Sequence, residues 1–91
     1  MSSLSREDEL LIVLAEECGE ATQVASKIIR FGNSERNTEN LTQELGDLQC
    51  MINMAVHYGL INEYDLRIAT ENKRIKLQRY STHLNNMPGE K

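Results

Sequence analysis

The chain has little that breaks a helix and little that could cross-link a fold. Its 91 residues include one proline, Pro88, and two cysteines, Cys18 and Cys50. A single proline near the C-terminus leaves the rest of the chain free to form long helices. Two cysteines inside predicted helices make no disulfide framework, and we expect Cys18 to be a small buried apolar residue in a reducing compartment. Cytoplasm is therefore the expected location.

Long apolar runs and basic clusters are also missing. No apolar run is long enough to span a membrane, and the polar and acidic residues after Met1 predict neither a secretory signal nor a basic arm. The net charge is −4, and without five clustered acids it would be +1. The acidity is thus local. The sequence has no basic stripe that could bind phosphates, so we expect neither a nucleic-acid polymer nor an anionic membrane as a partner.

Apolar residues recur at helical spacing and nowhere alternate convincingly with a period of two. A first helix is predicted from about Ser5, a capping residue, to Phe31, with Gly32 as its stop. A polar connection over 33–40 follows, in which Asn37 or Thr38 is the expected N-cap of a second helix over about 39–58.

A third helix is predicted from the cap Asn62 to about Tyr80. Its expected apolar contacts are Ile68, Ala69, Ile75 and Tyr80. The predicted fold is all-α, an antiparallel helical hairpin plus a third helix, in one domain over 1–82 with a frayed tail over 83–91. Both long helices carry two apolar stripes that so short a chain cannot cover, so we expect oligomerisation to complete a four-helix-bundle core, as a homodimer or homotetramer.

Two acidic clusters interrupt the apolar stripes of the first two helices. The first is Glu16-Glu17-Cys18-Gly19-Glu20 and the second is Glu44-Leu45-Gly46-Asp47. The stripes that contain them are Leu10, Val13, Glu17, Glu20, Val24 and Glu44, Asp47, Met51, Met54, Tyr58. Carboxylates on faces that meet another helix repel one another unless a cation neutralises them. Oxygen ligands in this number favour a hard divalent cation, Mg²⁺ above all.

The glycine within each cluster supports a site, because glycine inside a helix costs about 1 kcal/mol relative to alanine. We expect Gly19 and Gly46 to remove side-chain bulk beside the carboxylates or to allow close approach of the helices. The alternative is a pair of solvated acidic faces. A di-iron centre is disfavoured because neither His57 nor His83 follows a glutamate at the required spacing, and zinc because histidine and cysteine show no ligand spacing.

The two-part acidic pattern resembles the signature of MazG-type all-α nucleoside triphosphate pyrophosphohydrolases. Glu-Glu-x-x-Glu at 16–20 is followed, after 23 residues, by Glu-x-x-Asp at 44–47. The segments 25–32 and 73–81 are similar to small MazG-like proteins often encoded by phages, and the resemblance covers about residues 9–81.

The resemblance implies hydrolysis of a nucleoside triphosphate between its α and β phosphates, which gives a monophosphate and pyrophosphate. It implies Mg²⁺, with Mn²⁺ as a possible substitute, held by Glu17, Glu20, Glu44 and Asp47. Glu16 is the candidate that orients or deprotonates the attacking water. Two alternatives stay open: a non-catalytic helical module that senses nucleotides or binds a protein, and an enzyme like phosphoribosyl-ATP pyrophosphatase, to which only Gly19-Glu20-Ala21-Thr22 corresponds.

Basic residues are candidates for gripping phosphate. Lys27 is the most suggestive, since it lies seven residues after Glu20 on nearly the same helix face. Asn72 and Lys73 on the third helix are further candidate substrate-binding residues. Arg30, Arg74 and Lys76 fit a role in surface solubility better.

Overall fold

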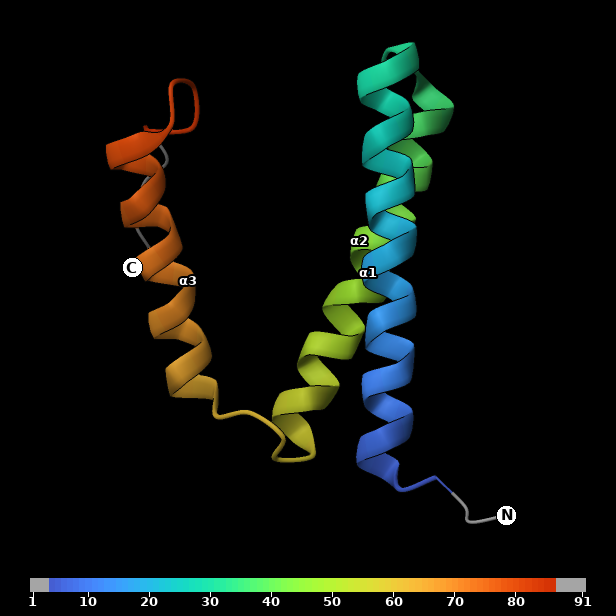
Figure 1. Cartoon of the computed structure of the whole chain (residues 1–91), viewed down its shortest axis with the longest axis vertical. Coiled ribbons are helices and arrows are strands. Elements are labelled where there is room, and N and C mark those ends of the chain that lie inside the picture. The colour runs from blue at the N-terminus through green and yellow to red at the C-terminus, as the bar shows by residue number, and fades with distance from the viewer. Residues whose placement is uncertain (1–3, 87–91) are drawn as a thin grey trace. The chain divides into compact units, whose positions relative to one another are not determined.

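The computed structural model describes residues 4–86, and this part of the chain is all-α (Figure 1). Helix α1 spans Arg6–Phe31, α2 spans Glu35–His57 and α3 spans Glu63–Tyr80, and no strand is present among these residues. The predicted fold class is confirmed. The chain divides between Leu60 and Ile61 into two compact units, one holding the hairpin of α1 and α2 and the other holding α3. The single domain over 1–82 stays a prediction.

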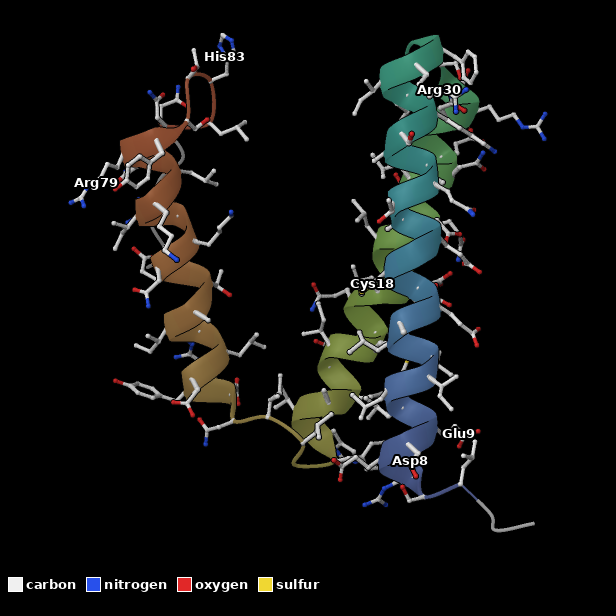
Figure 2. The ribbon with its side chains drawn as sticks, viewed as in Figure 1. Asp8, Glu9, Cys18, Arg30, Arg79 and His83 are labelled. Carbon is white, nitrogen blue, oxygen red and sulfur yellow. The ribbon has the colours of Figure 1, made fainter. Side chains whose placement is uncertain are left out.

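Helix α1 begins and ends where capping rules place its ends. The Ser5 hydroxyl accepts a hydrogen bond from the Asp8 amide at 3.0 Å, and Gly32 ends the helix at a φ of +86°. This backbone angle is strained for any residue with a Cβ, which explains the glycine. Acidic residues such as Asp8 and Glu9 lie in the first turn and Arg30 lies in the last, so both ends complement the helix dipole (Figure 2).

Helix α2 begins four residues earlier than predicted. Its N-cap is Ser34, whose hydroxyl accepts from the Asn37 amide at 3.1 Å. The two expected caps lie inside the helix and bind back to the turn: Asn37 Nδ2 donates to the Gly32 carbonyl, and Thr38 Oγ1 donates to Asn33 Oδ1. The predicted start was wrong because the polar residues of the first turn extend a helix without showing apolar periodicity.

The end of α2 matches the prediction and closes against the core. The Leu60 amide donates to the Ala55 carbonyl at 2.9 Å, and Gly59 takes a φ of +78°. This six-to-one hydrogen bond is typical of a Schellman ending, in which the residue after the glycine packs on the last helical turns. Leu60 does so, since it packs against the core that contains Ala55.

The hairpin core is small and lies toward one end. Leu10, Met51 and Ala55 are buried, and Val13, Leu14 and Leu60 pack against them. Large apolar side chains elsewhere on the hairpin are exposed, including Leu11 at 44% and Leu45 at 49%. Cys18 and Cys50 are exposed free thiols, so the expected burial of Cys18 is not found within the chain. The hairpin by itself therefore leaves much apolar surface in water.

Helix α3 makes its own cap but has no core. Asn62 accepts from the Asp65 amide at 3.1 Å, as predicted, and none of the helix residues is buried. Ile68 and Ile75 are each 44% exposed and Tyr80 is 78% exposed, whereas Leu66 and Leu77 are half-buried. The expected apolar contacts of Ile68, Ala69, Ile75 and Tyr80 stay a prediction, because no residue of α3 is buried within its own unit. Of the predicted tail, residues 83–86 are not helical, and 87–91 lie outside the described residues.

Among the described helices, none combines the length and the apolar character that crossing a bilayer requires.

Candidate metal centre

The two acidic clusters meet between α1 and α2. Glu17 and Glu20 come from α1, and Glu44 and Asp47 come from α2. One carboxylate oxygen of each lies within 4.8 Å of the corresponding oxygen of the other three. The prediction that these side chains face each other across an antiparallel hairpin is therefore confirmed as geometry, for all four of the residues predicted to be metal ligands.

The register of the hairpin explains this meeting. Glu20 lies 11 residues before the end of α1, and Glu44 lies nine residues after the start of α2. At about 1.5 Å of rise per residue, they stand about 16 and about 14 Å from the turn. The early start of α2 matters here, because a start at Glu39 would place Glu44 only about 8 Å from the turn. The helix start set by the Ser34 cap thus places the two acidic clusters at similar distances from the turn.

The burial of the four side chains is unequal. Glu17, Glu44 and Asp47 are half-buried, and Glu20 is exposed. Glu17 Oε2 and Glu44 Oε2 are fully enclosed and have no hydrogen-bond partner. An enclosed carboxylate oxygen without a partner is costly, because it has lost water and gained nothing in exchange. A bound cation would give both oxygens the partner that they lack.

The carboxylates repel one another, and their proton affinities reflect it. The pKa of Glu44 is raised to about 7, first because its proton can be shared in a hydrogen bond with Glu20, then by desolvation and by the charges of Glu20, Asp47 and Glu17. The pKa of Glu17 is also raised, first by desolvation and then by the charges of Glu20, Asp47 and Glu16. Positive charge supplied at this place would reverse both effects.

No cationic side chain neutralises the cluster within residues 4–86. The two ion pairs in that part of the chain, Arg67 with Glu63 and Arg74 with Glu71, both lie on α3. Asp47 Oδ1 accepts a hydrogen bond from Gln43 Nε2 at 3.0 Å, which orients the carboxylate and leaves its second oxygen free. Sequence reasoning did not single out Gln43, although its position four residues before Asp47 is a usable signal.

The spacing of the oxygens suits a divalent cation. Magnesium binds oxygen at about 2.0–2.1 Å, so ligands on opposite sides of the ion are about 4.2 Å apart. The limit of 4.8 Å within which the four oxygens lie is close to this span. Hard carboxylate ligands also fit magnesium, manganese or calcium better than zinc.

The other predicted residues lie outside this group. Glu16 is exposed and is not one of the four clustered carboxylates, although its charge acts on Glu17. Lys27 is exposed on α1, two turns beyond Glu20. Asn72 and Lys73 are exposed on α3, in the other unit.

The glycines do not have the role expected of them inside the hairpin. A Cβ at Gly19 or Gly46 would have no heavy atom within 4 Å, so neither glycine makes room for the partner helix or for the carboxylates. Both face open space on the outer surfaces of the helices. The sequence argument mistook proximity along the chain for a shared direction, although neighbours on a helix point about 100° apart.

Comparison of the chain with protein-family models, with curated proteins and with solved structures gives no match.

The raised pKa of Glu44 predicts how stability changes with pH when metal is absent. Between pH 4.5 and about 7 the folded state keeps a proton that the unfolded chain releases, so the Glu44 contribution to the free energy of unfolding falls as pH rises. We expect the free energy of unfolding, measured with urea in the presence of a chelator, to fall between pH 5 and pH 8. The fall should be smaller for Glu44→Gln than for wild type. Glu39→Gln, an exposed residue of the same helix, is the control and should behave as wild type. An equal fall in the free energy of unfolding for wild type, Glu44→Gln and Glu39→Gln would show that the clustered carboxylates do not destabilise one another.

Proposed function

We propose that the protein is a magnesium-dependent nucleoside triphosphate pyrophosphohydrolase that releases pyrophosphate and a nucleoside monophosphate. The observation that carries the proposal is the pair of enclosed, unpartnered oxygens on Glu17 and Glu44, two members of the group of four carboxylates. The same four residues form the acidic pattern that resembles MazG-type enzymes. The geometry supports the metal site, and the resemblance supplies the reaction.

Each carboxylate has a distinct part in this proposal. Glu17 and Glu44 present enclosed oxygens, and Gln43 holds Asp47 with one oxygen free. Exposed Glu20 forms the side of the cluster that is open to a substrate. Bound magnesium would supply charge neutralisation for the triphosphate and a lowered pKa for coordinated water.

Glu16 is the proposed general base. It is exposed, it neighbours Glu17 and it lies four residues before Glu20, so its carboxylate stands beside the cluster without belonging to it. A carboxylate there can accept a proton from water that attacks the α-phosphate. Lys27, from the same helix, is proposed to bind the substrate.

Metal binding should stabilise the folded chain through these carboxylates. Magnesium at 100 times its dissociation constant would raise the free energy of unfolding by about 2.7 kcal/mol. Thermal melts of wild type should therefore shift upward with Mg²⁺ or Mn²⁺, and Glu17→Gln/Glu44→Gln should lose the shift while melting higher than metal-free wild type, since repulsion is gone. Glu7→Gln/Glu9→Gln removes the same charge from the first turn of α1 and should keep the shift. A shift that survives in the first double variant would refute the site.

Cleavage should fall between the α and β phosphates. An analogue with a methylene bridge between α and β should bind and resist hydrolysis, whereas one blocked between β and γ should still yield the monophosphate. Anion chromatography of the products distinguishes cleavage between the α and β phosphates from cleavage between the β and γ phosphates. Glu20→Gln and Asp47→Asn should abolish turnover of the second analogue, because each removes a metal ligand. Hydrolysis of the first analogue with release of phosphate would instead make the protein a γ-phosphatase.

Glu16→Gln separates the base from the metal site. It should keep the magnesium-dependent thermal shift and lower kcat by about 10²-fold or more, the usual contribution of a general base. Normal turnover by this variant would remove Glu16 from the mechanism and leave the four ligands in place.

We propose further that the chain assembles at least as a dimer. Leu11 on α1 and Leu45 on α2 lie away from the carboxylates by helical position, and both are exposed. Covering this apolar side with a second copy would complete a four-helix core and leave the acidic side free. Light scattering at micromolar concentration should give at least twice the monomer mass, and Leu11→Glu should lower it with helicity retained. A well-folded wild-type monomer would contradict the assembly.

A further inference from the structure

A groove runs along the hairpin next to the carboxylates and was not anticipated from the sequence. Leu10 and Val13 of α1 line it, with Met51, Met54 and Tyr58 of α2, and Arg6 and Glu9 bring opposite charges to it. Its volume is about 330 Å³, at the small end of ligand pockets. The groove is apolar inside and has no net charge.

The groove and the carboxylate cluster lie one helical turn apart on both helices. Val13 lies four residues before Glu17 on α1, and Met51 lies four residues after Asp47 on α2. Residues four apart on a helix share a face and are separated by about 6 Å along the axis. A ligand whose charged part binds at the carboxylates therefore meets apolar side chains within one helical turn.

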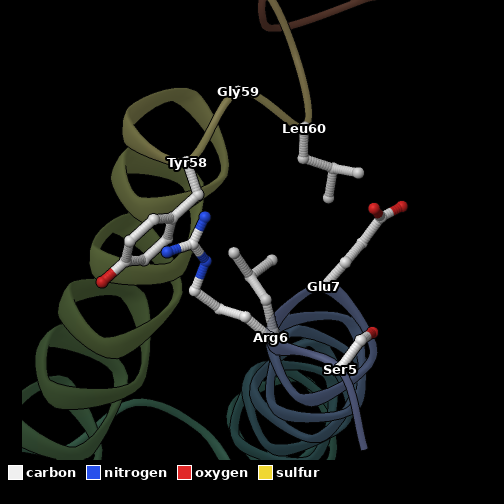
Figure 3. A pocket seen from close by; sticks show the side chains of 7 residues that line it. Ser5, Arg6, Glu7, Tyr58, Gly59 and Leu60 are labelled. Carbon is white, nitrogen blue, oxygen red and sulfur yellow. The ribbon is translucent and has the colours of Figure 1, made fainter.

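The far end of the groove is formed by a stacked pair. The Arg6 guanidinium lies 4.2 Å from the centre of the Tyr58 ring, and Figure 3 shows it lying against the ring. Both residues also line a second hollow of about 300 Å³ beside Ser5, Glu7 and Leu60. The stack therefore stands between the groove and this hollow. A cation–π contact of this kind limits the motion of an otherwise 43% exposed tyrosine.

We propose that the groove holds the nucleoside of the same triphosphate whose phosphates bind at the carboxylates, an inference that rests on the proposed function. The base lies against the side chains of Met51 and Met54, because thioether sulfur makes favourable contacts with aromatic faces and adapts to their shape. An uncharged, flat group suits a groove with apolar walls and balanced charges. The α and β phosphates then stand at Glu17, Glu20, Glu44 and Asp47.

Lys27 fixes the direction of the terminal phosphate. It lies two turns beyond Glu20, on the side of the cluster opposite to the groove, at about 10 Å along the helix axis. Side chains on a helix lean toward its N-terminus, so the Lys27 ammonium reaches back toward the cluster. Along α1 the order is thus an apolar groove, a carboxylate cluster and a lysine. A nucleoside, metal-bound phosphates and a terminal phosphate match that order.

Methionine methyl NMR tests this placement without requiring turnover. The chain has four methionines: Met51 and Met54 line the groove, and Met1 and Met87 lie near the chain ends and serve as internal controls. The probes are the α,β-methylene analogues of ATP, GTP, CTP and UTP, added singly with Mg²⁺. Inorganic tripolyphosphate with Mg²⁺ is the matched ligand that lacks a nucleoside. Calorimetry measures the affinity of each probe.

At least one nucleotide analogue should shift the Met51 and Met54 signals by its ring current, and tripolyphosphate should bind with both signals in place. If tripolyphosphate binds and no analogue moves these signals, the nucleoside lies elsewhere and the metal site stands. If tripolyphosphate moves them equally, the shifts report a change in the hairpin and the inference fails. If neither probe binds, the inference fails together with the proposed function.

Two variants separate the parts of the ligand. Met54→Ala should weaken the binding of the nucleotide analogue about tenfold and leave tripolyphosphate unchanged, and Met54→Leu should restore most of the loss. Met54 is 40% exposed, so the hairpin tolerates the change. Lys27→Gln should weaken both ligands about tenfold, as expected for a charged contact to phosphate. Equal loss of both ligands in Met54→Ala would overturn the assignment of the groove.

Discussion

Mutual repulsion among carboxylates held between two helices is the constraint on which the hairpin depends. Four acidic side chains converge where neighbouring residues of the same stripes form an apolar core. Two of their oxygens have lost water without gaining a partner. The pKa of Glu44 is raised first through a hydrogen bond with Glu20 and that of Glu17 first through desolvation, and the neighbouring charges raise both further. A cation at this position would turn the least favourable feature of the hairpin into a stabilising one, and this is the reason we propose the cluster as a cation site.

The rest of the hairpin positions this cluster. The Ser34 cap and the turn at Gly32 set the register in which both pairs of acids stand level, and the core around Leu10, Met51 and Ala55 holds the helices together one to two turns away. Along α1 the groove residues precede the acids and Lys27 follows them, so the groove lies on one side of the cluster and Lys27 on the other. Local capping chemistry thereby sets the order of groove, acids and lysine along the hairpin.

Sequence patterns gave the helices and the four clustered acids because these follow from local rules. Ser5, Asn62 and Gly59 signal helix ends through backbone chemistry, and the spacing of Glu17, Glu20, Glu44 and Asp47 places each pair on one face. Features that depend on a particular register could not be obtained in this way. The true start of α2, the open space around Gly19 and Gly46, and the Arg6–Tyr58 stack all require knowing which residues stand opposite one another.

Paramagnetic broadening by Mn²⁺ tests the central claim most directly, because the chain contains two acid-rich places. Glu7, Asp8 and Glu9 crowd the first turn of α1 as exposed charges, whereas the four clustered carboxylates enclose two unpartnered oxygens. At substoichiometric Mn²⁺, amide signals should broaden first around Glu17–Ala21 and Glu44–Leu48, with the signals of residues 7–9 retained. Equal broadening at both places, or broadening that begins at residues 7–9, would show that the cluster is an ordinary acidic surface and would contradict the account.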